Sequence, residues 1–158
     1  QTVNRLRNSA STNVQWSEVD VETVNASTVA DSISVDRPRD GLAAVRAILE
    51  SGGEAITVAD EDILAAIPEM ASLSGVFPEP AAAAPWAAVK QMVSEDKIAA
   101  DELVVCLVSG NGLKDVAAAQ SAVGQPQLID PSLDAVKAAV FDNRPAPGRK
   151  RTESSKHR

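Results

Sequence analysis

The longest apolar run in the chain, residues 103–108, stops abruptly at the polar, glycine-rich stretch 109–112 (SGNG). An apolar run without polar alternation is typical of a strand buried on both faces, the usual state in a parallel sheet. Two shorter segments, 19–24 and 54–59, also have the composition of strands. The pattern therefore predicts three strands, and the last one ends where open α/β sheets bind their ligands.

Apolar residues at helical spacing occupy the segments around these strands. The predicted helices cover residues 1–8, 41–51, 61–74, 81–94, 114–122 and 132–141. Asp40 and Asp60 are the expected N-caps of the second and third of these helices. Because strands alternate with helices, the predicted fold class is α/β, with a mainly parallel sheet and flanking helices. The alanine-rich fourth helix is expected to approach that sheet closely.

The length of 158 residues suits one folded domain. Residues 1–142 are the predicted folded portion, and residues 143–158 form a polar tail that is expected to be disordered. Residue 1 is Gln, and residues 1–8 have the pattern of the closing turns of a helix. We expect the chain to be the carboxyl-terminal portion of a longer protein.

Composition narrows the classes of function. A net charge of -7 and few aromatic residues argue against a nucleic-acid partner. No apolar run approaches the roughly 20 residues of a membrane span, so no membrane partner is expected. A single cysteine, Cys106, cannot form an internal disulfide, which favours a reducing compartment and hence the cytoplasm. One histidine, His157, leaves no Cys/His cluster, so no metal site is predicted.

Two places have residues suited to chemistry. The stretch 109–112 offers a hydroxyl, an amide and two flexible glycines, which is the composition of a ligand-contacting turn. A tight strand-to-helix turn without a ligand has the same composition, so both interpretations stay open. Glu79 stands between two prolines in an apolar segment, and a carboxylate held so rigidly is a candidate for function. Lys114 is interpreted as an exposed residue at the start of a helix.

Four blocks of sequence resemble the carboxyl-terminal part of threonine synthase, a pyridoxal-phosphate enzyme of the tryptophan-synthase-β fold, or fold type II. In chain order they are VADSISVDRPRDGLAAVRAI, GGEAITVADEDILAAI, GVFPEPAAAAPWAAV and ELVVCLVSGNGLKD. The resemblance covers about residues 19–120, and VSGNGLKD and SISVDRPRDG favour threonine synthase over its relatives. It implies pyridoxal 5'-phosphate as the cofactor. The implied reaction converts O-phosphohomoserine and water to L-threonine and phosphate, in a full-length enzyme expected to be a cytoplasmic homodimer.

The resemblance also implies roles for individual residues. Ser109 matches the Ser or Thr that hydrogen-bonds the pyridine nitrogen of the cofactor, and Gly110 matches the glycine that lets the backbone pass close to the ring. Glu79 matches the glutamate of an E-P-A motif near the ring edge. Ser32 lies in an Ala-Asp-Ser turn where related enzymes have Ala-Asp-Gly beside the cofactor. The chain is thus expected to contribute the pyridine-ring side of a cofactor site.

No catalytic residue is assigned within the chain, because the family's Schiff-base lysine and phosphate-binding loop lie in motifs that precede these blocks. We therefore expect the chain alone to be inactive. Two alternatives stay open. The chain could belong to another fold type II enzyme, namely a serine or threonine dehydratase, a racemase or a cysteate synthase. It could also be a non-catalytic α/β remnant.

Overall fold

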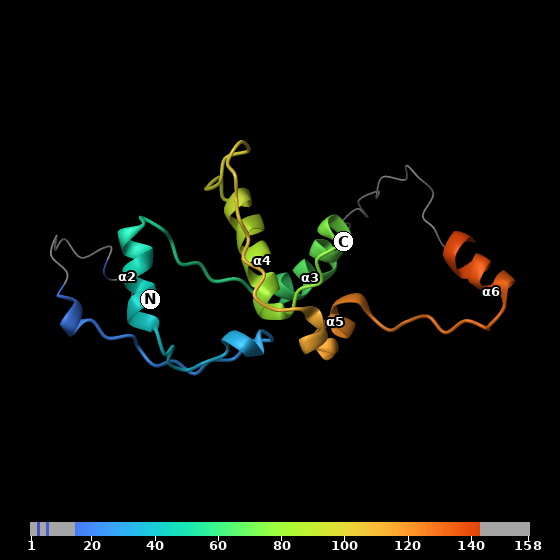
Figure 1. Ribbon diagram of the computed structural model, residues 1–158, viewed down its shortest axis with the longest axis horizontal. Helices are drawn as coiled ribbons and strands as arrows, with labels where there is room; N and C mark the ends of the chain where they lie inside the picture. Colours follow the sequence, from blue (N-terminus) through green and yellow to red (C-terminus); the bar gives the residue numbers. More distant parts are fainter. Residues whose placement is uncertain (1–2, 4–5, 7–14, 143–158) are drawn as a thin grey trace, which may run out of the picture. The chain divides into compact units, whose positions relative to one another are not determined.

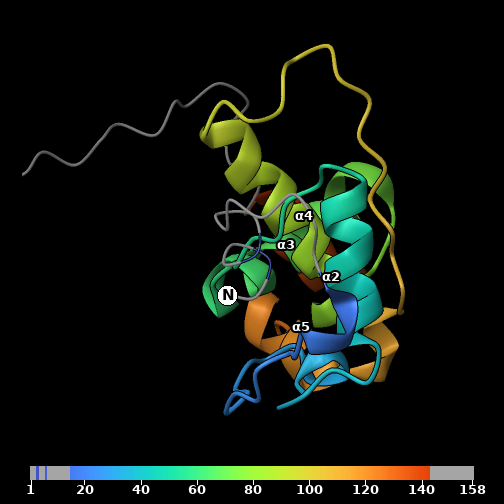
Figure 2. The same ribbon diagram turned by 90° about the vertical axis from the view of Figure 1, so that its left-hand side faces the viewer.

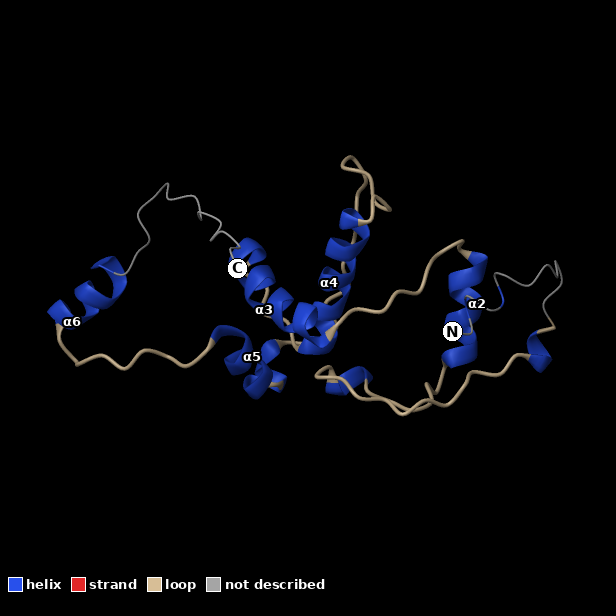
Figure 3. Cartoon of the chain, turned by 180° about the vertical axis from the view of Figure 1, so that it is seen from behind, coloured by secondary structure: helices blue, strands red, loops and turns tan. Residues whose placement is uncertain are grey.

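The computed structural model describes residues 3, 6 and 15–142. Helices and connecting loops make up this part of the chain (Figures 1 and 3). The α-helices are α2 (Gly41–Glu50), α3 (Asp60–Ser74), α4 (Pro80–Ser94), α5 (Val116–Val123) and α6 (Leu133–Lys137). Short 3-10 turns form η1 (Trp16–Glu18), η2 (Asp31–Ile33) and η3 (Gly112–Lys114), and a π-helical turn, η4 (Ala138–Asp142), extends α6. The predicted helices are confirmed to within a few residues wherever they are described; of residues 1–8, only Val3 and Leu6 are described, and both are helical.

The predicted parallel sheet does not form among the described residues. Segments 19–24, 54–59 and 103–108 have no strand partner, and the one bridge in the described part joins Pro78 and Asn111 in antiparallel fashion (Figure 3). The run 103–108, expected to be buried on both faces, is instead exposed: Leu103 is 94% exposed and Val105 87%. The physical reason is that a strand satisfies its main chain only through neighbouring strands, so its composition does not suffice to build a sheet.

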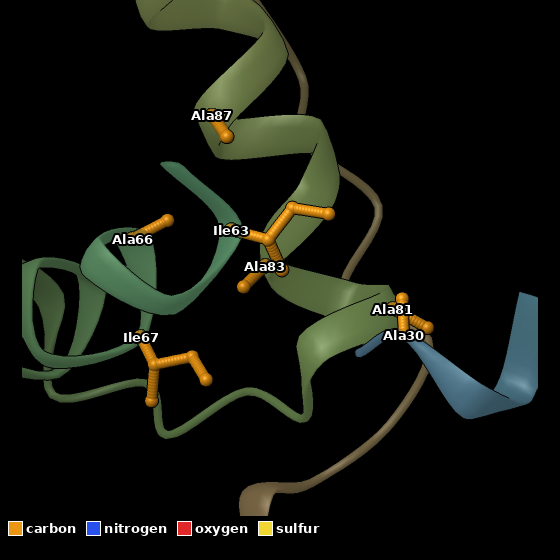
Figure 4. Close-up of a cluster of buried hydrophobic side chains, with 7 residues drawn as sticks. All are labelled: Ala30, Ile63, Ala66, Ile67, Ala81, Ala83 and Ala87. Carbon is orange, nitrogen blue, oxygen red and sulfur yellow. The ribbon is translucent and has the colours of Figure 1, made fainter. Parts of the chain in front are cut away.

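The core lies between helices (Figure 4). Its buried members come from α3, from α4 and from the residue just before η2: Ala30, Ile63, Ala66, Ile67, Ala81, Ala83 and Ala87. Helices α3 and α4 pack against each other, and α3 also contacts α5 (Figures 1 and 2). The alanines of α4 permit this close approach because no long side chain separates the helices. Their predicted packing on a sheet is therefore corrected to packing on a helix.

The start of α3 ties this core to the loop before η2. Asp60 was the expected N-cap, but Ala59 occupies the cap position and Asp60 is the first helical residue. The Asp60 carboxylate instead accepts hydrogen bonds from the Thr28 hydroxyl at 2.5 Å and from the Val29 amide at 3.1 Å. These two bonds hold the loop against the helix and place Ala30, which is fully buried, in the core.

The chain divides into two compact units, residues 1–124 and 125–158. The first contains η2, α3, α4, η3 and α5, and hence all four residues predicted to contact the cofactor. The predicted tail 143–158 lies outside the described residues, so the predicted boundary at residue 142 stays a prediction. Within the described ranges, no helix has both the length and the apolar character needed to cross a membrane.

Candidate functional site

A short antiparallel contact joins the segment before α4 to the glycine-rich turn. The amide of Glu79 donates to the carbonyl of Gly110 at 3.0 Å, and the amide of Gly112 donates to the carbonyl of Phe77 at 2.9 Å. Pro78 and Asn111 form the bridge between them. The turn that follows the apolar run is thus held by main-chain hydrogen bonds against the amino-terminal end of α4.

Both glycines of this turn are required because a neighbouring side chain packs directly against the main chain at each position. A Cβ atom on Gly110 would lie 1.9 Å from Glu79 Oε1 and 2.3 Å from Glu79 Cδ. A Cβ atom on Gly112 would lie 2.4 Å from the ring of Phe77. Residues two apart in an extended segment face the same side, so Gly112 faces Phe77 and Gly110 faces Glu79. Glycine is needed at both positions because the side chains of Glu79 and Phe77 occupy the space that a Cβ atom would take.

Glu79 is the centre of the candidate site. Its side chain is almost fully buried, at 4% exposure for the residue as a whole. Oε2 accepts a hydrogen bond from the Ser32 hydroxyl at 3.1 Å and lies 2.8 Å from Lys114 Nζ, which also lies 3.0 Å from Oε1. The carboxylate therefore joins three segments, η2, the start of α4 and η3. A cavity of about 300 Å³ opens beside it, lined by Asp31, Ser32, Glu79, Pro80, Ala81, Lys114 and Asp115.

The hydrogen bond from Lys114 holds the pKa of the Glu79 carboxyl below its ordinary value. Burial acts in the opposite direction, and the bond from Ser32 adds to the lowering. The negative charge of Asp115 raises the pKa slightly against these effects. A carboxyl whose pKa is lowered by folding stabilises the fold above its unfolded pKa. That contribution is lost as the pH falls through the lowered value.

The structure brings together three of the four residues that the sequence predicts. Ser32 and Gly110 both contact Glu79 directly. The fourth, Ser109, precedes Gly110 and is exposed, and no described residue forms a hydrogen bond with its hydroxyl. Ser32 has a structural role here, because its hydroxyl donates a hydrogen bond to Glu79.

Lys114 is the site residue that sequence reasoning missed. The prediction of an exposed helix-start residue is partly wrong, because Lys114 lies on η3 and its ammonium group pairs with a buried carboxylate, although its side chain is 57% exposed. No local pattern signals this pair, since Glu79 is 35 residues away in sequence. The nearest signal is the acceptor Asn111, whose side chain binds the Leu113 amide and shapes the turn that carries Lys114.

The chain belongs to the family of pyridoxal-phosphate-dependent enzymes, whose sequence profile matches residues 5–110. Enzymes of this family depend on pyridoxal phosphate, so family membership confirms the predicted cofactor. Membership in this family also implies a fold type II domain, although the described residues do not form its sheet.

The resemblance to threonine synthase is confirmed by curated relatives. The chain is 40% identical to the threonine synthase of Methanosarcina acetivorans over 117 residues, which is 74% of this chain and 29% of that protein. It is 38% identical to the threonine synthase of Methanocaldococcus jannaschii over 72% of this chain and 28% of that protein. The threonine synthase of Halalkalibacterium halodurans is 36% identical over 72% of this chain and 33% of its own length. The chain thus matches about a third of the length of these relatives.

The residues of the site fit one side of such a cofactor. The exposed hydroxyl of Ser109 has no partner among the described residues, and the main chain beside it at Gly110 carries no side chain. A polar ring atom could therefore reach the hydroxyl from the exposed side of the turn. Glu79 lies directly behind this glycine as a buried acceptor.

Proposed function

We propose that the chain contributes the pyridine-ring side of the cofactor site in a threonine synthase. The reaction converts O-phosphohomoserine and water to L-threonine and phosphate. The observation that carries this proposal is the convergence of Ser32, Glu79 and Gly110 on one point, next to Ser109. These residues come from three separate blocks of the resemblance to threonine synthase. The similarity of the chain to three threonine synthases supports the choice of reaction.

Pyridoxal phosphate, when bound, supplies an electron sink for the carbanions of amino-acid chemistry. Ser109 would hold the pyridine nitrogen by a hydrogen bond through its hydroxyl. A serine hydroxyl does not ionise at neutral pH, so it orients the nitrogen without keeping it protonated as a carboxylate would. Gly110 would bring its main chain close to the ring, while the face that carries no side chain packs on Glu79, which holds the turn in place. Ser32 orients the Glu79 carboxylate by donating a hydrogen bond to its Oε2.

Substitution of Ser109 tests this assignment. In the full-length enzyme, Ser109→Ala is expected to lower the affinity for pyridoxal phosphate about tenfold, because one hydrogen bond to a polar cofactor atom is lost. Ser109→Thr keeps the hydroxyl and is expected to restore the affinity to within about twofold, well inside the cost of one lost hydrogen bond. Equilibrium titration of the apoenzyme, followed by cofactor absorbance, measures both. Equal affinities for all three proteins would contradict the role of Ser109.

Release of phosphate from O-phosphohomoserine distinguishes threonine synthase from the other members of the family. We infer that the full-length enzyme is a cytoplasmic homodimer and that it releases phosphate from this substrate in step with threonine formation. A serine or threonine dehydratase, a racemase or a cysteate synthase would leave the substrate phosphate intact. Measuring inorganic phosphate and threonine in one reaction therefore separates the alternatives. Threonine formation from this substrate would also rule out a non-catalytic remnant.

We further infer that residues 1–158 alone form no covalent adduct with pyridoxal phosphate. The lysine at the site, Lys114, is paired with Glu79, and the family's Schiff-base lysine belongs to another motif. After incubation with the cofactor and reduction with borohydride, intact-mass measurement is expected to show no specifically modified species. Free pyridoxal phosphate with a lysine-containing peptide serves as the control for non-specific labelling. A stoichiometric adduct on Lys114 would overturn this prediction.

A further inference from the structure

Lys114 has a role at the site that the family resemblance does not assign. We propose that Lys114 is a positioning residue, which fixes the Glu79 carboxylate against Gly110 and thereby fixes the turn that presents Ser109. The part of this inference that concerns the cofactor rests on the proposed function. The part that concerns Glu79 and the turn stands on the geometry of this chain alone.

The first step is the attachment of Glu79 from two sides. Lys114 Nζ lies within 3.0 Å of both carboxylate oxygens, and the Ser32 hydroxyl binds one of them at 3.1 Å. Glu79 is buried, whereas more than half of the Lys114 side chain is exposed. The lysine therefore lies on the solvent side of the carboxylate, and Ser32 approaches it from η2. A buried carboxylate without a cationic partner would be strongly disfavoured, so the position of Glu79 depends on Lys114.

The second step is the dependence of the turn on Glu79. The carboxylate occupies the space directly over Gly110, where an added Cβ atom would lie 1.9 Å from Oε1. The main chain of the two residues is also joined by the 3.0 Å hydrogen bond from the Glu79 amide to the Gly110 carbonyl. Movement of the carboxylate would thus change the packing of Gly110. Ser109 directly precedes Gly110, so its hydroxyl would move with the turn.

Among the described residues, Lys114 is the cationic group that contacts Glu79. Asp115 follows Lys114, and Asp31 lines the cavity from η2. Both are acidic, and the other nearby polar group, the Ser32 hydroxyl, is neutral. Without Lys114, the carboxylate would face burial together with the negative charge of Asp115. The expected result is a raised pKa of Glu79 and a displaced carboxylate.

The first experiment measures Glu79 without any cofactor. The full chain is labelled with 13C at its glutamate carboxyl carbons, and the Glu79 resonance is assigned by its loss in Glu79→Gln. In Lys114→Met the pKa of Glu79 is expected to rise, and the amide shifts of Ser109 and Gly110 are expected to change. Lys114→Arg keeps the positive charge and is expected to restore the low pKa, which also guards against an effect of misfolding.

Lys90→Met provides the matched control. Lys90 also pairs with a glutamate, Glu69 on α3, and a hydrogen bond from Lys90 lowers the pKa of that carboxyl. The control variant is therefore expected to raise the pKa of Glu69 while leaving Glu79 and the Ser109 amide unchanged. If Lys114→Met and Lys90→Met leave the Glu79 titration equally unaffected, Lys114 does not position Glu79 and the inference is overturned.

The second experiment measures binding of pyridoxal phosphate by the full-length enzyme. Lys114→Met is expected to weaken binding about tenfold, comparable to the loss of one charge-assisted hydrogen bond. Lys114→Arg and Lys90→Met are expected to bind as the unaltered enzyme does. If the unaltered enzyme does not bind the cofactor, the proposed function fails. If it binds but Lys114→Met binds equally well, only the positioning role of Lys114 is overturned.

Discussion

Replacement of Gly110 by alanine is expected to destabilise the protein by about 1–3 kcal/mol, the usual cost of forcing an extra group into a packed site. The added Cβ atom would lie 1.9 Å from Glu79 Oε1 and 2.3 Å from Cδ. A flexible side chain on the surface could move aside, but this carboxylate is buried and is held by Lys114 and Ser32. Relief of the clash therefore breaks an ion pair or displaces the main chain. Urea unfolding followed by circular dichroism measures the loss.

Gly53→Ala is the matched control for this substitution. The atom nearest to a Cβ on Gly53 is Ser51 Oγ at 3.0 Å, the end of an exposed side chain. This hydroxyl can shift by exchanging its exposed hydrogen bonds with Ile48 and Gly53 for bonds to water. A change within about 0.5 kcal/mol is expected there, as for most surface substitutions. Combining Gly110→Ala with Glu79→Ala tests the cause, because the clash is absent in the double variant. An equal cost of Gly110→Ala with and without Glu79 would contradict the proposed contact.

Replacement of Ile67 by alanine is expected to cost about 2–5 kcal/mol, as large-to-small substitutions in a packed core do. Ile67 on α3 is 2% exposed and belongs to the cluster that joins α3 to α4 (Figure 4). Most of the other members of this cluster are alanines, whose side chains are too short to fill the cavity that the substitution would leave. The expected signature is a lower urea midpoint with an unchanged dependence on urea concentration.

Leu73→Ala is the matched control because Leu73 lies on the same helix but is 72% exposed. It removes a side chain of similar size from a surface position, so a change within about 0.5 kcal/mol is expected. If Ile67→Ala and Leu73→Ala destabilise the protein equally, the cluster between α3 and α4 does not form the core.

The two substitutions test different levels of the structure. Ile67 stabilises the pair of helices on which the site is built, whereas Gly110 lies in the site itself. Helix α4 connects them, because its first turn follows Glu79 and its alanines pack on α3. A change at Ile67 is therefore expected to weaken cofactor binding only as far as it unfolds the protein. A change at Gly110 is expected to lower both the stability of the fold and the affinity for the cofactor directly.

Local sequence pattern predicts the helices, and the resemblance to a known family predicts candidate residues of the site. Helical spacing located α2, α3 and α4, because amphipathic periodicity and end signals such as Gly75 are local properties of the chain. Motifs that resemble a known family predict Ser32, Glu79, Ser109 and Gly110 as site residues, and the structure brings the first two together with Gly110.

Local pattern does not predict whether the extended segments pair or what Glu79 contacts. The segment 103–108 has the composition of a buried strand, yet it is exposed, because strand pairing depends on partners far away in sequence. The same reason explains Lys114, whose partner lies 35 residues earlier. Short-range sequence pattern predicts helices because the main-chain hydrogen bonds of a helix join residues close in sequence. Pairings between distant segments are decided by packing in three dimensions, and the candidate site consists of such pairings.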